Sequence, residues 1–181
     1  PDEGTGTDAI LVAAAIQAVS EGDFSSSANA TRLEFMTGAS EAATVKMSIK
    51  SDGDVGIGTT APECELHVFK ASSGASTDTN AVVHIENSAT TVLQLSAGTS
   101  NDCHIAFGDS GNQNIGSIAY LNNGNALAFR TDNSEKMRLT SGGNLGLVTD
   151  ASVLSFGANS EVTLTHVHDT GLLLNSTMAI Q

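Results

Sequence analysis

The sequence predicts an all-β protein. Apolar and polar residues alternate with a period of two in many short segments, as in strands that bury one face. Most of these segments are bounded by Asn-Gly, Asp-Gly, Gly-Asn or Gly-Gly pairs, which favour turns. Helical periodicity competes only at 9–19, where the apolar-rich residues fit either state. We predict a strand there, because apolar residues alternate from Ile10 to Ala18 and leave no charged face for a helix to expose.

The strands expected after 9–19 follow from the same alternation. They lie at 66–69, 104–108, 117–121, 126–130, 136–140 and 161–168. Between the strands at 117–121 and 126–130, the pair Asn123-Gly124 supplies the positive φ angles that a tight hairpin needs.

The stretch 50–60, KSDGDVGIGTT, has two interpretations. In the structural one, Lys50-Ser51-Asp52-Gly53 forms a turn, after which Val55 and Ile57 face inward and the glycines beside them let a neighbouring backbone approach. In the other, the glycines cradle a phosphate. The GxxxxGK and GxGxxG frames of phosphate-binding loops do not occur here, so we favour a strand corner.

An internal repeat supports the strand corner. Residues 33–59 align with 127–149 when four residues are dropped from the first copy. The shared frame is Leu-x-Phe-x-Thr, then Lys-Met-x-(Ile/Leu), then Ser-x-Gly-(Asp/Asn)-(Val/Leu)-Gly-(Ile/Leu). Gly58 of the first copy is replaced by Val148 in the second, a change that a strand corner tolerates better than a phosphate-binding loop.

The repeat sets the expected organisation of the chain. Upstream of each copy, 14–18 and 116–120 are candidate equivalent strands. We expect a first strand repeat at 1–70, a second at 71–150 and the start of a third strand segment at 151–181. Because the chain begins at Pro1 and not at Met, we also expect it to be a piece of a longer protein.

Composition and charge exclude several classes of protein. The chain has 7 Lys and Arg against 20 Asp and Glu, a net charge of −13 that repels nucleic-acid phosphates and anionic membranes. Its longest apolar run, at 9–19, is too short to span a membrane. Cys64 and Cys103 lie far apart without CxxC spacing, so we expect free thiols. With no Trp and one Tyr, one copy has few large side chains for a core, so we expect it to be stable only when it assembles with other copies.

Residues 47–68, MSIKSDGDVGIGTTAPECELHV, resemble a repeat of bacteriophage tail fibres and tail spikes. The specific part is G-I-G-T-x-x-P-x-x-x-L-H-V, which in that family often precedes a self-cleaving chaperone domain. The segment 134–147 resembles the same element in weaker form, and 161–181 is similar to segments of fibre-like phage proteins. The resemblance implies an elongated, intertwined homotrimeric fibre of short strands and hairpins, a shaft of the β-prism or β-helix kind. The catalytic Ser-Lys pair of the chaperone domain has no matching segment in this chain.

The resemblance also implies a function. It suggests a structural virion protein without enzymatic activity or cofactor, a shaft segment of a phage tail fibre that positions host-surface recognition. The expected partners are two further copies of the chain, other virion tail proteins, and a host cell-surface glycan or protein. The expected location is the virion, with synthesis in the host cytoplasm and action at the host surface. Two alternatives stay open: a polysaccharide-degrading tail spike that uses paired carboxylates, and a bacterial surface adhesin or filament repeat.

The sequence assigns no catalytic, cofactor-binding or metal-binding residue. Asp169-Thr170-Gly171 matches the triplet of aspartic proteases, but His168 precedes it in place of an apolar strand, so we expect a turn that reverses the chain. His166 and His168 would share one face of a strand, and in a three-fold fibre they could converge around an axial metal. Against this, interior histidines often bond to backbone. The other histidines are interpreted as isolated, ordinary strand residues: His67, His84 and His104.

Overall fold

The computed structural model describes residues 11–158, 162–167 and 171–175. Within these ranges the chain forms strands, turns and loops only, which confirms the prediction of an all-β protein. The described part therefore contains no helix of the length and hydropathy needed to cross a membrane. The chain divides into two units, Pro1–Leu93 and Gln94–Gln181, which are taken in turn.

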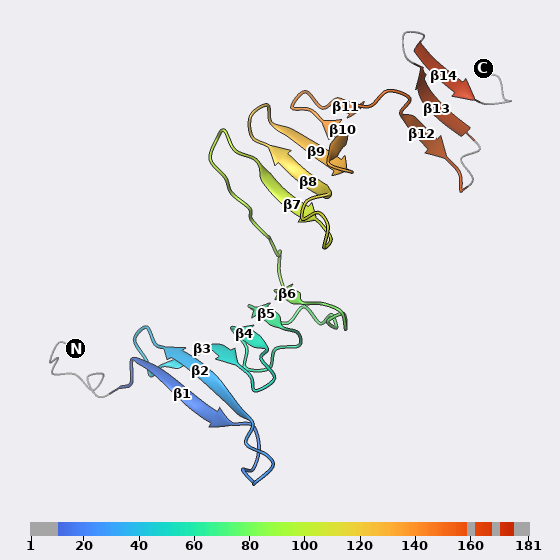
Figure 1. Cartoon of the computed structure of the whole chain (residues 1–181). Coiled ribbons are helices and arrows are strands. Elements are labelled where there is room, and N and C mark those ends of the chain that lie inside the picture. Colours follow the sequence, from blue (N-terminus) through green and yellow to red (C-terminus); the bar gives the residue numbers. More distant parts are fainter. Residues whose placement is uncertain (1–10, 159–161, 168–170, 176–181) are drawn as a thin grey trace. The chain divides into compact units, whose positions relative to one another are not determined.

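The first unit contains one six-stranded sheet with the strands in sequence order (Figure 1). Strands β1 to β4 form an antiparallel meander, whereas β4, β5 and β6 are parallel to one another. The two parallel strands are reached through loops at 58–65 and 70–82. The strands are β1 (Ala14–Ser20), β2 (Thr31–Thr37), β3 (Thr44–Ile49), β4 (Val55–Ile57), β5 (Leu66–Phe69) and β6 (Val83–Glu86).

The second unit contains two antiparallel sheets. The larger has the order β11-β10-β9-β8-β7, so every strand pairs with its neighbour in sequence. The smaller has the order β12-β13-β14. The strands are β7 (Cys103–Phe107), β8 (Gly116–Leu121), β9 (Ala126–Thr131), β10 (Ser134–Leu139), β11 (Leu145–Leu147), β12 (Val153–Phe156), β13 (Val162–Val167) and β14 (Gly171–Asn175).

The strand predicted at 9–19 is confirmed from Ala14 onward, where β1 begins, whereas residues 11–13 are described but lie before the strand. The hairpin predicted around Asn123-Gly124 is also confirmed, because β8 and β9 pair with Leu121 opposite Ala126. Its turn differs from the prediction. The positive φ angles occur at Gly124 (114°) and Asn125 (50°), and not at Asn123. The connection is therefore a four-residue loop, 122–125, and not a two-residue turn.

The internal repeat is present in the pairing of the strands. β2, β3 and β4 form the same antiparallel meander as β9, β10 and β11, and β1 occupies the place of β8 beside it. The register is also the same in both copies. Ile16 lies opposite Phe35 in the first copy, as Ile118 lies opposite Phe129 in the second. The same row then continues through Met47 and Ile57 in the first copy and through Met137 and Leu147 in the second.

The corner at 50–58 is a structural turn. Gly53 donates its N–H to the carbonyl of Lys50 at 3.0 Å, which closes the predicted turn. Gly58 has a φ of +82° and donates its N–H to the carbonyl of Lys46 at 2.9 Å. The equivalent N–H of Val148 donates to Lys136 at 3.1 Å. The N–H of Gly58 is therefore bonded within the sheet and is not free to bind a phosphate, as expected for a strand corner.

Gly58 differs from Val148 because β5 runs beside β4. A Cβ on Gly58 would lie well inside van der Waals contact with the carbonyl oxygen of Phe69, the last residue of β5. β11 is the last strand of its sheet, so Val148 has no such neighbour among the described strands. The close approach of a neighbouring backbone that the glycines predicted is thus confirmed for Gly58.

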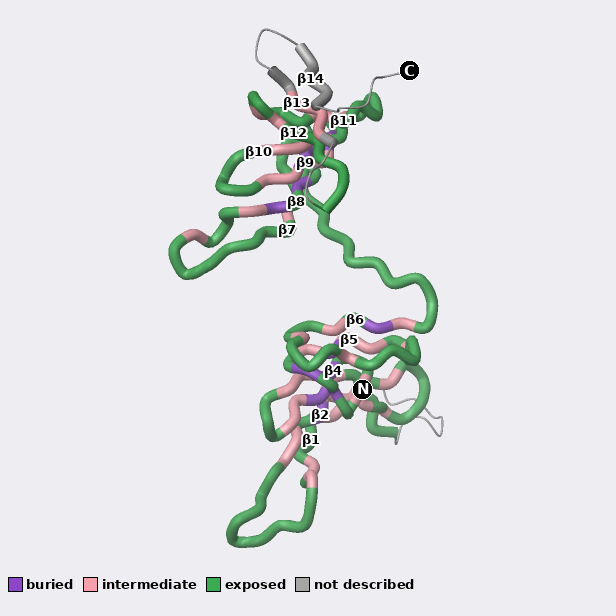
Figure 2. The backbone as a smooth tube through the Cα atoms, turned by 90° about the vertical axis from the view of Figure 1, so that its right-hand side faces the viewer, coloured by how far each residue is buried: buried purple, intermediate pink, exposed green. Residues whose placement is uncertain are grey.

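The covered face of the first sheet is polar. Its buried side chains include Glu34, Ser48, His67 and Glu86, whereas Ile57 on the opposite face is 43% exposed. In a single chain Gly56 is the buried residue of β4, so the prediction that Val55 and Ile57 face the shared interior of several chains stays a prediction. Figure 2 shows that buried residues occupy only a few short stretches of the chain. The buried apolar residues among those described are Cys64, Ala119, Leu121, Ala126 and Ala128.

Candidate functional site

The first sheet carries a continuous apolar surface on its open side. Cross-strand partners share a face, so the pairing places two rows of apolar side chains across all six strands. Ile16, Val83 and Ile57 within them are 69%, 54% and 43% exposed. The rows are Ile16, Phe35, Met47, Ile57, Val68, Ile85 and Ala18, Leu33, Ile49, Val55, Leu66, Val83, here named the first apolar face.

The five-stranded sheet carries an equivalent surface. Its rows are Ile105, Ile118, Phe129, Met137, Leu147 and Cys103, Tyr120, Leu127, Leu139, Leu145, here named the second apolar face. Leu145 is 65% exposed and Ile105 is 46% exposed. The opposite face of this sheet is covered and built from small residues such as Ala119 and Ala128, both fully buried. Exposed apolar surfaces of this continuity mark interaction sites in soluble proteins.

An ion pair organises the covered side of the first sheet. Glu34 on β2 is buried and accepts bonds from Arg32 Nε at 2.6 Å and from Gln17 Nε2 at 2.7 Å. The Arg32 guanidinium and the Gln17 amide hold the pKa of Glu34 below its ordinary value. These contacts fix β1 to β2 on the side opposite the first apolar face, because Gln17 and Glu34 are cross-strand partners.

We expect Glu34→Gln to lower the free energy of unfolding by about 1–2 kcal/mol at pH 7, because Arg32 loses its charged partner. Since folding lowers the pKa of Glu34, the carboxylate stabilises the fold above the range in which an unfolded glutamate titrates. This contribution is lost as the pH falls through the folded-state pKa. The difference between wild type and variant should therefore shrink below about pH 4. Urea unfolding at pH 7 and at about pH 3, at one fixed chain concentration, measures it.

Glu41→Gln is the matched control for this prediction, since Glu41 is exposed and its one hydrogen bond is to the neighbouring Ser40. Its stability should stay within about 0.5 kcal/mol of wild type at both pH values. A difference between Glu34→Gln and wild type that persists at low pH would show that the carboxylate's charge is not the cause.

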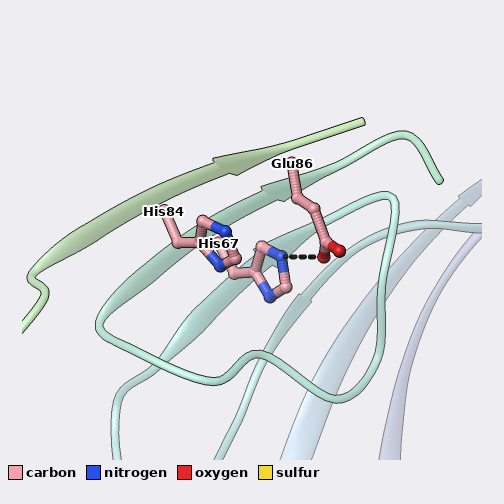
Figure 3. A group of neighbouring side chains, drawn as sticks. All are labelled: His67, His84 and Glu86. Carbon is pink, nitrogen blue, oxygen red and sulfur yellow. Dashed lines mark ion pairs between the residues drawn. The ribbon is translucent and has the colours of Figure 1, made fainter. Parts of the chain in front are cut away.

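A cluster of titratable side chains lies at the β6 edge of the same covered face (Figure 3). It consists of His67 on β5 with His84 and Glu86 on β6, and their ligand atoms all lie within 4.8 Å of one another. The parallel register places His67 directly opposite His84, and the two rings stack with centroids 4.7 Å apart. His67 Nε2 lies 3.3 Å from Glu86 Oε2. The ring of Phe69, on the same strand, lies perpendicular to the ring of His67, with the two centroids 5.6 Å apart.

The loop 70–82 holds two members of this cluster in place. Ser73 donates its backbone N–H and its hydroxyl to Glu86 Oε1, at 2.5 and 2.9 Å. These two bonds hold the pKa of Glu86 below its ordinary value. Thr77 Oγ1 lies 2.7 Å from His84 Nδ1 and donates to Glu63 Oε2 at 2.5 Å. The residues that hold the cluster in place, Ser73, Thr77 and Glu63, thus lie in the two loops that connect the parallel strands.

The cluster was missed by sequence reasoning, and the interpretation of His67 and His84 as isolated strand residues is wrong. For His104, the structure shows one ion-pair contact among the described residues, between Nε2 and Asp102 Oδ2 at 4.0 Å. Alternation identifies which face a residue occupies but not which strand lies beside it. The one available signal was the spacing of His84 and Glu86, which places both side chains on one face of a strand.

The remaining sequence candidates have separate outcomes. His168, Asp169 and Thr170 lie outside the described residues, and for His166 only the backbone pairing with Leu172 is described. The turn predicted there lies outside the described residues; the strands on either side, β13 and β14, are antiparallel neighbours with Val167 opposite Gly171. Cys64 and Cys103 are free thiols, as predicted.

Comparison with models of protein families, with curated protein sequences and with solved structures returned no match to this chain.

Proposed function

We propose that this chain is a structural segment of a self-assembling fibre, in which copies of the chain cover one another's apolar faces. The observation that carries the proposal is the pair of apolar faces, which cross every strand of the two larger sheets and stay open in a single chain. None of the residues in these faces is charged, although the chain holds 27 charged residues in all. The acidic groups that would repel a second copy therefore lie elsewhere.

The exposed area supports assembly. The chain exposes 13,084 Å². Two compact units of half its mass would together expose about 10,000 Å². Apolar burial contributes about 25 cal/mol per Å², and a fully buried Ile or Leu side chain contributes roughly 1.5–3 kcal/mol. Because the buried apolar residues of a single chain are mostly alanines, covering the two faces is the largest gain in stability open to it.

The occupant we propose for the faces is the same chain. In an assembly with closed rotational symmetry every copy has identical neighbours, so no terminal copy is left with an uncovered apolar face. The choice of three copies follows from the resemblance of residues 47–68 to phage tail-fibre repeats. In that role the chain is a shaft segment of a virion appendage, joined to other tail proteins, which positions recognition of a host-surface glycan or protein. Its contribution is mechanical, and the proposal assigns it no catalytic step.

We expect the chain to form a trimer in solution, with a mass of about three times the 18.4 kDa of one chain. Light scattering coupled to size-exclusion chromatography measures this mass, and dilution should lower the melting temperature because assembly is linked to folding. A monodisperse monomer that melts cooperatively, at a temperature independent of concentration, would overturn the proposal.

A further inference from the structure

We propose that His67, His84 and Glu86 form a binding site for a divalent transition-metal ion, with zinc as the best match. The site lies within one chain, so it goes beyond the fibre function and does not depend on it. Two imidazoles and one carboxylate are a ligand set that zinc uses, and such a set leaves a fourth position for water. Figure 3 shows the three side chains converging from two adjacent parallel strands.

The first argument is the buried imidazole of His67. Its side chain is 3% exposed, and neither ring nitrogen has a hydrogen-bond partner among the described residues. Leaving a buried polar group unsatisfied is unfavourable, so these nitrogens favour a ligand. Nε2 lies 3.3 Å from Glu86 Oε2 without the alignment of a hydrogen bond. In a tetrahedral site with bonds of about 2.1 Å, ligand atoms lie roughly 3.4 Å apart, so this pair is already at the right separation.

The second argument is the tautomer of His84. The single proton of the Thr77 hydroxyl is donated to Glu63, so Thr77 Oγ1 can only accept from His84. His84 Nδ1 therefore carries the proton of the neutral ring, and Nε2 keeps a free lone pair. Metal-binding histidines are oriented in this manner, by a bond from the ring nitrogen that does not bind the ion.

The third argument is Glu86. Ser73 occupies Oε1 with two donors, so the carboxylate is anchored through one oxygen while Oε2 faces His67. Ligating carboxylates are commonly held in this way by outer hydrogen bonds. The ligand atoms lie within 4.8 Å of one another, so the widest pair must close by up to about 1.4 Å, and the stacked rings must tilt, for all three to bind one ion. His84 is only half-buried, which gives the ion a path from solvent.

Zinc titration of the full chain tests the site. Calorimetry in metal-free buffer is done in the His166→Gln/His168→Gln background, so that those residues contribute nothing. We expect one ion per chain with a dissociation constant below about 10 µM. His84→Gln should weaken binding by roughly 100-fold or more, because one of three protein ligands is lost. His104→Gln is the control and should bind as its background does.

Thr77 tests the geometry separately from the ligands. Thr77→Val removes the acceptor for His84 Nδ1 and should weaken zinc binding roughly 10- to 100-fold. Thr77→Ser keeps the hydroxyl and should bind zinc as the background protein does. Cobalt(II) in place of zinc gives visible absorption bands whose intensity reports tetrahedral coordination. Circular dichroism checks that each variant keeps its strands. Absence of uptake by the background protein, or equal affinity of His84→Gln and His104→Gln, would overturn the site, whatever the oligomeric state.

Discussion

Gly58→Ala is expected to destabilise the protein by about 4 kcal/mol or more, although it adds one methyl group at the surface. Two effects combine. At a φ of +82° an L side chain is strained by about 1–2 kcal/mol. In addition, the new Cβ would collide with the carbonyl oxygen of Phe69, a backbone atom that cannot rotate away. Relief requires β5 to move from β4, which would break the parallel pairing of Ile57 with Val68.

Gly53→Ala separates these two effects. Gly53 also has a positive φ, of 100°, but a Cβ there would have open space around it. This variant should therefore show the strain alone, about 1–2 kcal/mol. Urea unfolding gives the total for each variant. The thiol of Cys64, which is 7% exposed just before β5, gives a local measure, since it should react faster with a thiol reagent when β5 separates. Equal destabilisation by the two variants would contradict the role assigned to the β4–β5 contact.

The sequence predicts the antiparallel part of this fold well. Alternation and turn residues are local signals, and β2–β3–β4 and β9–β10–β11 are meanders in which each strand pairs with the next. The two copies that the repeat frame aligns also share their register, since Phe35 and Phe129 take equivalent partners, Met47 and Met137. The turn at 122–125 shows the limit of local signals. Asn123 and Asn125 both flank Gly124, and the sequence does not indicate that Asn125 is the one with the positive φ.

The candidate metal site could not be predicted in the same way. It exists because β5 and β6 are parallel, and parallel neighbours are joined through loops whose path no alternation pattern encodes. His67 and His84 are 17 positions apart in sequence and stack only in this register. Ser73 and Thr77, which hold the cluster in place, lie in the loop 70–82, whose sequence indicates only a polar connection between strands. The sequence indicates that Gly58 lies at a corner, but it does not indicate that the Phe69 backbone lies so close that only glycine fits there.

A charged residue on the second apolar face should separate assembly from folding. Ile105 and Ala106 are neighbours on β7, both exposed in a single chain, and their side chains lie on opposite faces of the sheet. Ile105 belongs to the row that continues through Ile118 and Phe129, whereas Ala106 lies opposite Ser117. If the chain acted alone, Ile105→Glu and Ala106→Glu would each change stability by about 0.5 kcal/mol, as exposed substitutions do.

In the proposed assembly the two variants differ sharply. Ile105→Glu loses about 2 kcal/mol of apolar burial in each chain, before the cost of burying a carboxylate is added. Three copies per trimer make this about 6 kcal/mol, which is roughly four orders of magnitude in the association constant. We therefore expect Ile105→Glu to be monomeric or aggregated at micromolar concentration, with Ala106→Glu still trimeric by light scattering. The two variants carry the same added charge, so a general repulsion between acidic chains would affect both equally. If both variants stay trimeric, the second apolar face is not where the copies meet; if both become monomeric, the added charge and not its position is the cause.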